Sequence, residues 1–381
     1  MGDRAVVTVV TRDHLHYARA LMASLRQVHP DLPVFVCLVD RPPQGAETAG
    51  DPARYLLAEE LGIPGWPRFA FQYLPFELTC ALKPHALRYV LALGFEQVLY
   101  LDADIQVYQS LETLYGRLQD CNLILTPHLL SPLPDDRKRP NESMFLLSGV
   151  FNGGFLGLRN GEVATAFLRW WADKVRRSCI IDQAGGLFVD QRWLDLAIGL
   201  FEGIHIERRP GFNVGHWTFS QSRFSLADDG QVLVDGQPLV FFHFSSFSPA
   251  SPLDISFHQD RVALDGLPGL GRLLADYFQR LDACGRRECE AWGYGYATLT
   301  DGTPIQPLWR EAVRIGHRLL ADVVDPFDPA RMPGLIRRFR RANRHLRVRR
   351  AKQIVKTGWE LWRLRTRQQR GERRALRDRY V

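Results

Sequence analysis

The chain has 381 residues, of which 46% are hydrophobic and 24% charged, which is typical of a globular protein with one large domain or two smaller ones. Its six cysteines are widely spaced and include no Cys-x-x-Cys pair, which favours neither a disulfide framework nor a zinc site. The chain begins with a strand-like segment, and no apolar stretch approaches the roughly 20 residues of a membrane-spanning helix. We therefore expect a cytoplasmic, reduced protein.

The net charge of +7 is unevenly distributed along the chain. Residues 331–381 contain 19 Lys or Arg and 3 Asp or Glu, whereas the preceding 330 residues contain 30 basic and 39 acidic residues. The basicity therefore belongs to the C-terminal segment, and the body of the chain is acidic. An acidic body without a nucleic-acid-binding motif makes nucleic acid an unlikely partner, although the basic segment keeps that class as an alternative.

The N-terminal part predicts a strand–helix–strand unit of a parallel sheet. Residues 5–10 and 33–39 are rich in β-branched and other apolar residues and predict two strands. Between them, apolar residues recur at helical spacing. A nucleotide often docks where a first strand gives way to its helix. Thr11 lies at this position, where its backbone groups can bind a nucleotide base. The ring of Tyr17 can stack on the same base. A half-buried helix position is an equally good interpretation of Tyr17.

The next signal is a lysine near the start of a predicted helix. Residues 51–76 are rich in Pro and aromatic residues and predict irregular structure, and residues 79–93 predict an amphipathic helix. Lys83 precedes Pro84, which we place in the first turn of that helix. A helix N-terminus with a lysine is an anion site, and a solvated surface lysine is the alternative.

The segment GFEQVLYLDADIQVY, residues 94–108, carries the strongest signal. Its apolar run at 98–101 is typical of a strand buried on both faces. The run stops at Asp102, and Asp104 lies on the same side because residues i and i+2 of an extended chain point alike. Ligands bind at the carboxyl ends of strands in open α/β sheets, and two hard oxygen ligands suit Mg²⁺ or Mn²⁺. We interpret this pair as a metal–diphosphate site.

Four later segments contain polar residues that are candidates for binding a ligand. They are FNGGFLGL with Asn152, Gly153 and Gly154; FVDQ with Asp190 and Gln191; GFNVGHW with Asn213, His216 and Trp217; and LVFFHF with His243. Glycines beside an asparagine allow close approach to a ligand, although a tight turn needs them too. Asp190 is also a candidate helix N-cap.

The last of these segments, residues 239–244, predicts a hairpin with residues 232–234 across an Asp-Gly turn. From the residues alone, His243 is better interpreted as a core histidine than as a metal ligand.

In this order, the segments VVTRDHLHYARALMASL, YLDADI, FNGGFLGL, FVDQ and FHFS resemble GT-A glycosyltransferases, most nearly the retaining enzymes of glycosyltransferase family 8 and related bacterial saccharide transferases. The resemblance covers roughly residues 5–247. It implies an α/β fold of the Rossmann-like GT-A type, with a mostly parallel sheet flanked by helices. From about residue 256 the sequence pattern itself is helical and predicts a helical C-terminal extension. We accordingly expect a catalytic domain at 1–255, a helical accessory region at 256–330 and a basic amphipathic tail at 331–381.

The resemblance also implies roles for the residues above. Asp102, Asp104 and His243 would hold Mn²⁺ or Mg²⁺, which replaces the core interpretation of His243. Asn152 to Gly154 would contact the donor, with Asp190 and Gln191 as catalytic residues of the sugar pocket. We place Asn213, His216 and Trp217 at the acceptor. The family's late motif usually continues to a Gly and a Lys-Pro-Trp, whereas this chain reads HFSSFSP, so Lys83 would supply the charge to the diphosphate.

The expected reaction moves a sugar from a UDP- or GDP-sugar to a saccharide or lipid-linked acceptor, with retention, in bacterial surface glycan synthesis. A sugar nucleotidyltransferase is the alternative enzyme, although VVTRDHLHYARA lacks the usual Gly-rich phosphate loop.

The basic tail contains an apolar stripe at near-helical spacing. The stripe comprises Leu335, Phe339, Leu346, Val355, Trp359 and Trp362. A helix of this kind predicts a peripheral position on an anionic membrane, at the inner face of the plasma membrane. The alternatives are a disordered basic tail and a helix docked on the acidic body.

Overall fold

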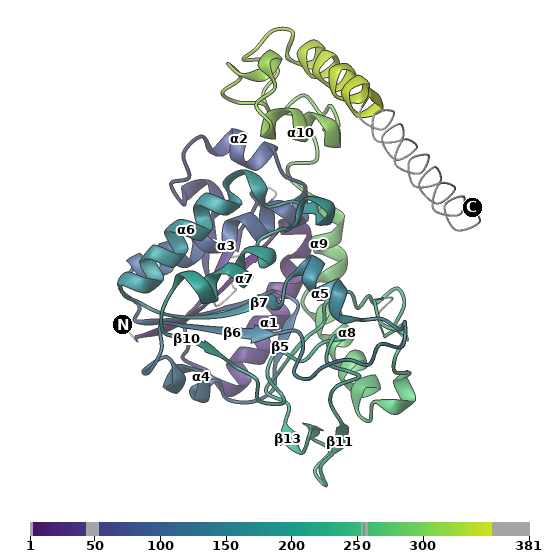
Figure 1. Ribbon diagram of the computed structural model, residues 1–381. Coiled ribbons are helices and arrows are strands. Elements are labelled where there is room, and N and C mark those ends of the chain that lie inside the picture. The colour runs from purple at the N-terminus through teal and green to yellow at the C-terminus, as the bar shows by residue number, and fades with distance from the viewer. Residues whose placement is uncertain (1–2, 43–52, 253, 256–257, 353–381) are drawn as a thin grey trace, which may run out of the picture. The chain divides into compact units, whose positions relative to one another are not determined.

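The computed structural model describes residues 3–352 except 43–52, 253 and 256–257 (Figure 1). The chain divides into two compact units, Met1–Ala297 and Thr298–Val381. Among the described residues, no helix is long and apolar enough to cross a membrane.

The N-terminal unit is built on a seven-stranded sheet with the order β10-β6-β7-β4-β1-β2-β3. The strands are β1 (Arg4–Val10), β2 (Val34–Leu38), β3 (Arg54–Leu57), β4 (Gln97–Leu101), β6 (Leu123–Pro127), β7 (Phe151–Arg159) and β10 (Ile204–Ile206). All neighbours are parallel except that β7 runs antiparallel to β4 and β6. Strands β2, β4 and β6 are buried throughout, which explains their mostly apolar sequences.

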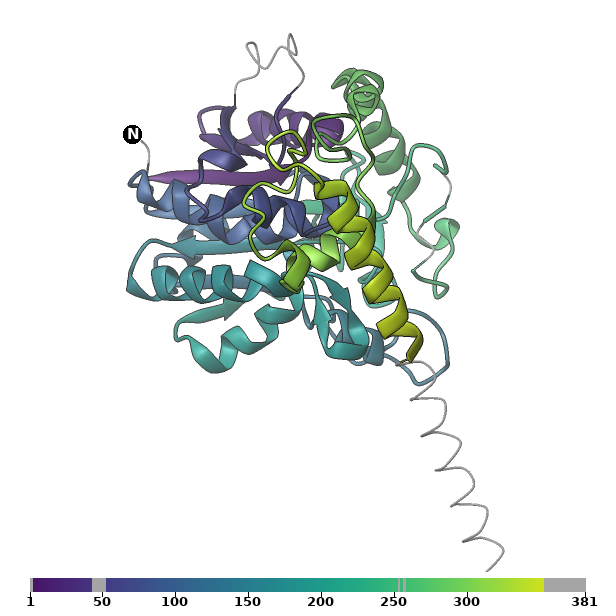
Figure 2. The same cartoon turned by 90° about the horizontal axis from the view of Figure 1, so that it is seen from above.

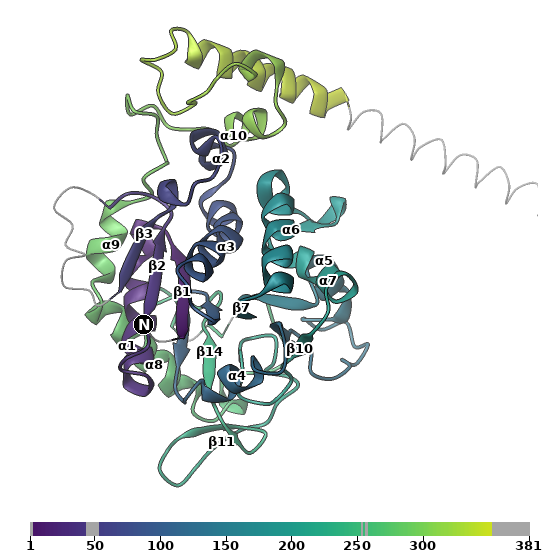
Figure 3. The same cartoon turned by 90° about the vertical axis from the view of Figure 1, so that its left-hand side faces the viewer.

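Helices cover both faces of this sheet, as Figures 1 and 3 show. α3 (Pro75–Ala92) and α6 (Glu162–Ser178) pack together on one face, whereas α1 (Leu15–Val28) lies on the other, next to α8 (Leu270–Ala283). The mostly parallel α/β sheet flanked by helices, predicted from the sequence, is confirmed. The remaining helices of this unit are α2 (Trp66–Phe71), α4 (Glu112–Arg117), α5 (Glu142–Ser148), α7 (Gln191–Leu200) and α9 (Arg286–Trp292).

Two local predictions before β4 are wrong. The segment predicted to be irregular contains β3 and α2. Helix α3 begins at Pro75, where the Glu77 carboxylate accepts a hydrogen bond from Leu74 N at 3.0 Å. Lys83 and Pro84 therefore lie inside the helix, and the predicted anion site at a helix N-terminus does not form there.

The predicted hairpin near residue 240 is only half correct. β12 (Val232–Val234) pairs with β13 (Gln237–Pro238) and with β11 (Phe224–Leu226) in a small antiparallel sheet. β14 (Phe241–His243) leaves this sheet and pairs with β5 (Ile105–Val107), with His243 opposite Ile105. Its two phenylalanines are fully buried there, because the apolar strand gains more by joining the core than by extending a surface hairpin.

The C-terminal unit contains α10 (Pro307–Arg314) and a helix at residues 335–352, drawn in yellow-green in Figure 2. The rings of Trp309 and Phe339 stack with centroids 4.9 Å apart. Leu335 and Leu346 are buried on the same helix face as Phe339. This half of the predicted apolar stripe is therefore buried, and Val355, Trp359 and Trp362 lie outside the described residues.

Candidate functional site

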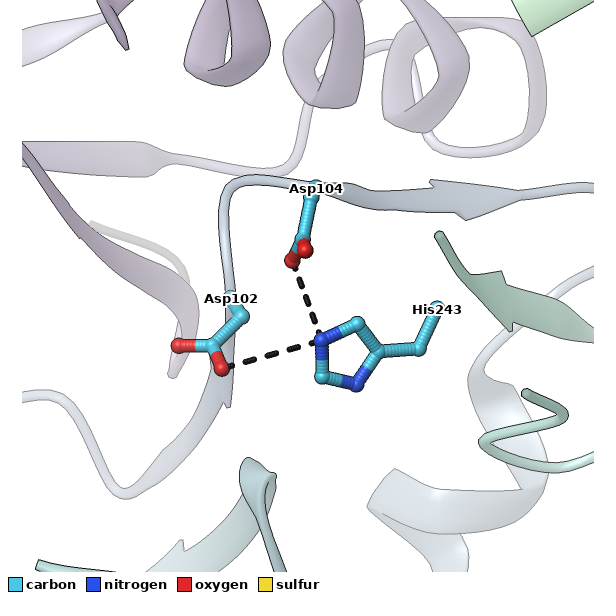
Figure 4. Close-up of side chains that lie close together, drawn as sticks. All are labelled: Asp102, Asp104 and His243. Carbon is cyan, nitrogen blue, oxygen red and sulfur yellow. Dashed lines mark ion pairs between the residues drawn. The ribbon is translucent and has the colours of Figure 1, made fainter. Parts of the chain in front are cut away.

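Asp102, Asp104 and His243 converge at the end of β4 (Figure 4). The two aspartates lie in the turn between β4 and β5, where Ile105 N donates to Asp102 O at 3.0 Å. The pairing of β14 with β5 brings His243 Nε2 within 3.0 Å of Asp104 Oδ1 and 3.8 Å of Asp102 Oδ2. One ligand atom from each residue lies within 4.8 Å of the others, so the three side chains can hold one cation.

Asp104 and His243 each stabilise the charged form of the other. Burial by itself would raise the pKa of Asp104, but the nearby imidazole outweighs it and lowers this pKa. Burial by itself would lower the pKa of His243, but the Asp104 carboxylate raises it. Two carboxylates and an imidazole form a donor set that can hold a divalent cation, and such a cation would offset the crowded negative charge.

Lys83 lies at the centre of the site and is only 3% exposed, which rules out the solvated surface lysine. Its Nζ lies 2.9 Å from Gly153 O and 3.2 Å from both Asp102 Oδ1 and Asp190 Oδ2. Burial by itself would lower the pKa of Lys83, but the two carboxylates raise it well above its usual value. One of its N–H groups thus donates to Gly153 O, and two carboxylates lie at ion-pair distance from its charge.

Asp190 is the N-cap residue of α7, but its side chain makes no capping hydrogen bond and instead pairs with Lys83. Burial raises the pKa of this carboxyl, while Lys83 partly offsets the effect. The adjacent Gln191 accepts a hydrogen bond from Gly153 N at 2.9 Å and donates one to Ser148 O at 3.0 Å. Gln191 therefore links Gly153, in strand β7 (Phe151–Arg159), to the end of α5 by hydrogen bonds.

The glycines of FNGGFLGL lie within the continuous strand β7, so the tight-turn alternative is wrong. A Cβ on Gly154 would lie 2.3 Å from His243 Cε1 and 2.8 Å from Asn152 Oδ1. A Cβ on Gly153 would lie 3.2 Å from Asp190 Oδ2. These two positions therefore leave little room for a side chain, because side chains of the site pack directly against the backbone of β7.

A buried polar layer lies behind His243. Asn152 Oδ1 accepts from Gly154 N at 2.9 Å and from Asn213 Nδ2 at 3.0 Å, and it lies 3.3 Å from His243 Nδ1. Asn152 Nδ2 lies 3.2 Å from the ring of His128, which the sequence analysis missed. His128 directly follows strand β6, so the rule that ligand sites gather at strand ends could have found it.

The three predicted acceptor residues have different environments. Asn213 and Trp217 are both buried, at 2% exposure, and the Trp217 ring meets the His243 ring edge-on at 5.3 Å. His216 is half-buried and stacks on His258 at 5.3 Å. Asn213 and Trp217 thus support the site from behind.

Thr11 and Tyr17 line the same pocket as Lys83, Asp102 and Asp104, with a volume of about 370 Å³. His14, which the sequence analysis also missed, lines it too and stacks on Tyr17 with ring centroids 5.6 Å apart. The pocket therefore joins the end of β1 to the carboxylates. A larger groove of about 590 Å³ on the outer side of α3 contains none of these residues.

No model of a known protein family matches the chain. The chain is 29% identical to the uncharacterized protein YfnF of Bacillus subtilis over 253 residues, which is 64% of this chain and 81% of that protein. It is 24% identical to YfnD of the same organism, also uncharacterized, over 247 residues, or 63% and 77% of the two chains.

Several solved glycosyltransferases show a distant structural likeness. The galactosyltransferase LgtC, crystallised with donor and acceptor sugar analogues, matches 73% of this chain and 95% of its own, with 17% identity and a TM-score of 0.40. GlyE of Streptococcus pneumoniae matches 76% and 64%, with 14% identity and a TM-score of 0.40. The bifunctional WbbM matches 76% and 51%, with 11% identity and a TM-score of 0.43. Scores this low assign by themselves neither a fold family nor an activity.

Proposed function

We propose that this chain is a GT-A glycosyltransferase that moves a sugar from a nucleotide-diphosphate donor, a UDP- or GDP-sugar, to a saccharide or lipid-linked acceptor. The observation that carries the proposal is the convergence of Asp102, Asp104 and His243, of which the two aspartates line a pocket that also reaches Thr11 and Tyr17. A cation site at one end and an aromatic face at the other match the two ends of a nucleoside diphosphate.

The balance of charge at the site favours a polyanionic substrate held through a cation. Three carboxylates, those of Asp102, Asp104 and Asp190, face Lys83 and His243 within 3.8 Å. Without a further cation this arrangement would repel a diphosphate, whereas a bound Mg²⁺ or Mn²⁺ reverses the local field. The proposed metal ligands are therefore Asp102, Asp104 and His243.

A cation held by Asp102, Asp104 and His243 would stabilise the negative charge that develops on the leaving diphosphate. Lys83 adds a fixed positive charge from beneath β7. Asp190 is buried beside Gly153, so we propose that it acts on the donor sugar from behind, through its ion pair with Lys83. Of the described residues that line the pocket, the carboxylates are Asp102 and Asp104, both assigned to the metal. We therefore propose that the acceptor hydroxyl attacks from the leaving-group face, with retention of configuration and proton transfer to the leaving phosphate.

The competing enzyme class, a sugar nucleotidyltransferase, fits less well. Such enzymes hold a triphosphate on a glycine-rich loop after the first strand. Here the connection from β1 to α1 is residues 11–14, Thr-Arg-Asp-His, which contains no glycine. The proposed product is accordingly a nucleoside diphosphate and not pyrophosphate.

A donor screen tests this proposal. We expect the full-length chain, supplied with Mn²⁺ and a panel of UDP- and GDP-sugars, to release nucleoside diphosphate from one or a few donors, and EDTA to abolish the release because the site loses its cation. Incubation with nucleoside triphosphates and sugar 1-phosphates provides the comparison. Pyrophosphate release in those tubes, with no diphosphate release from nucleotide sugars, would instead identify a nucleotidyltransferase.

We further propose that the C-terminal unit binds the cytoplasmic face of the plasma membrane, as an enzyme of surface glycan synthesis acting on a lipid-linked acceptor would require. Since Leu335, Phe339 and Leu346 are buried, the described helix can contribute only its charged face. That face presents exposed Arg337, Arg340, Arg344 and Arg347. Each basic residue near an anionic surface contributes about 1 kcal/mol.

Replacing these four arginines with glutamine should weaken binding to vesicles of phosphatidylcholine and phosphatidylglycerol by about tenfold or more. Truncation is less informative, because residues 335–352 also complete the fold of their unit. The matched control replaces four exposed arginines of the N-terminal unit, Arg26, Arg169, Arg176 and Arg177. Vesicle flotation at low and high salt measures both variants. Equal weakening in the two would show that net charge, and not this helix face, is responsible.

A further inference from the structure

The two carboxylate oxygens of Asp102 have different surroundings. Oδ1 accepts a hydrogen bond from the Tyr100 hydroxyl at 2.6 Å and lies 3.2 Å from Lys83 Nζ. Oδ2 lies on the side of His243, 3.8 Å from its Nε2. One oxygen is thus engaged by Tyr100 and Lys83, and the other lies on the side of His243, with which the dashed line in Figure 4 marks its ion pair.

Tyr100 is held firmly in this role. It lies in β4 two residues before Asp102, on the same side of the strand, and is fully buried. Its ring packs against Lys83, whose Nζ lies 5.0 Å from the ring centroid. Tyr100 and Lys83 therefore form one unit beneath the Asp102 carboxylate.

We propose that Tyr100 is a positioning residue that restricts Asp102 to a single metal-binding oxygen, and that it thereby favours Mg²⁺ and Mn²⁺ over Ca²⁺. The inference rests on the metal site of the proposed function. Mg²⁺ requires a near-ideal octahedral shell, which a one-oxygen carboxylate suits. Ca²⁺ accepts more ligands and commonly takes both oxygens of a carboxylate. A hydrogen bond to Oδ1 is thus a selectivity device, since it competes with the bidentate mode.

Tyr100→Phe removes the hydroxyl and leaves the ring in place. Tyr115→Phe is the matched control, because Tyr115 is equally buried in the same unit and its hydroxyl donates to Ala5 O at 3.2 Å, away from the carboxylates. Both variants lose one hydrogen bond made by a buried tyrosine hydroxyl. Only Tyr100→Phe removes a hydrogen bond from an oxygen of a proposed metal ligand.

The test is calorimetric titration of wild-type protein and both variants with MnCl₂ and with CaCl₂, without nucleotide or sugar. We expect Tyr100→Phe to lower the ratio of Mn²⁺ to Ca²⁺ affinity by roughly tenfold, the scale of effects from partners of metal ligands, and Tyr115→Phe to leave the ratio unchanged. An unchanged ratio in Tyr100→Phe, or equal changes in both, overturns the inference. If wild-type protein shows Mn²⁺-dependent diphosphate release while the ratio fails to move, only the inference falls. If it prefers Mn²⁺ through Tyr100 but transfers no sugar, only the proposed function falls.

Discussion

Replacing Asp104 with asparagine should lower sugar transfer by several orders of magnitude while leaving the fold intact. The amide keeps the size of the carboxylate but supplies no negative charge to a divalent cation, and it removes the ion pair with His243 at 3.0 Å. The fold is expected to survive because both aspartates lie in a partly accessible turn outside the buried strand. Asp102→Asn should have a similar effect. Initial rates with Mn²⁺, together with thermal unfolding, measure the two consequences separately.

Asp120→Asn is a suitable control, because Asp120 is exposed in the same unit, in the turn after α4. It should retain wild-type transfer. Full activity of Asp102→Asn or Asp104→Asn in a chelator-treated assay would eliminate the metal site from the proposal.

Asp190→Asn should reduce transfer by a factor of about 10² to 10³, the scale of losing one pre-organised electrostatic contact. If Asp190 were only an N-cap, its loss would cost about 1 kcal/mol of stability and no turnover. The side chain instead forms a buried pair with Lys83, and truncating one member of such a pair costs about 3–5 kcal/mol. Asparagine is therefore a better probe than alanine, because it keeps an acceptor for Lys83.

Asp195→Asn provides the matched control on the same helix. Asp195 accepts a hydrogen bond from Val150 N at 2.8 Å and pairs with Arg192, so its loss also costs stability. Steady-state transfer rates and unfolding temperatures of both variants decide the matter. If both variants lowered the unfolding temperature equally and Asp190→Asn kept the wild-type transfer rate, Asp190 would have only a structural role.

The central strand and its aspartates were predictable because the signal is local. A buried parallel strand requires an unbroken apolar run, so residues 98–101 and the two carboxylates after them could be located from periodicity alone. The position of His243 could not, since it depends on β14 leaving its sequence neighbour β13 for β5. Only the resemblance to known enzymes connected His243 with the metal.

The misplacement of Lys83 has a different cause. A proline usually marks the first turn of a helix, and Pro84 suggested a start near residue 79. The tertiary contacts of α3 with β1, β4 and α6 outweigh the cost of an internal proline, and the helix extends back to Pro75. The ion-pair partners of Lys83, Asp102 and Asp190, come from distant segments of the chain, so no local sequence pattern could predict that this lysine is buried.

The order in which the chain supplies these parts has a consequence for biosynthesis. All seven strands of the main sheet have left the ribosome once Ile206 has emerged, but the third proposed metal ligand follows only with β14 at residues 241–243. A nascent chain can therefore assemble its sheet while still lacking the complete ligand set. A cation that binds only the finished triad would stabilise the completed chain and not its shorter precursors, by mass action.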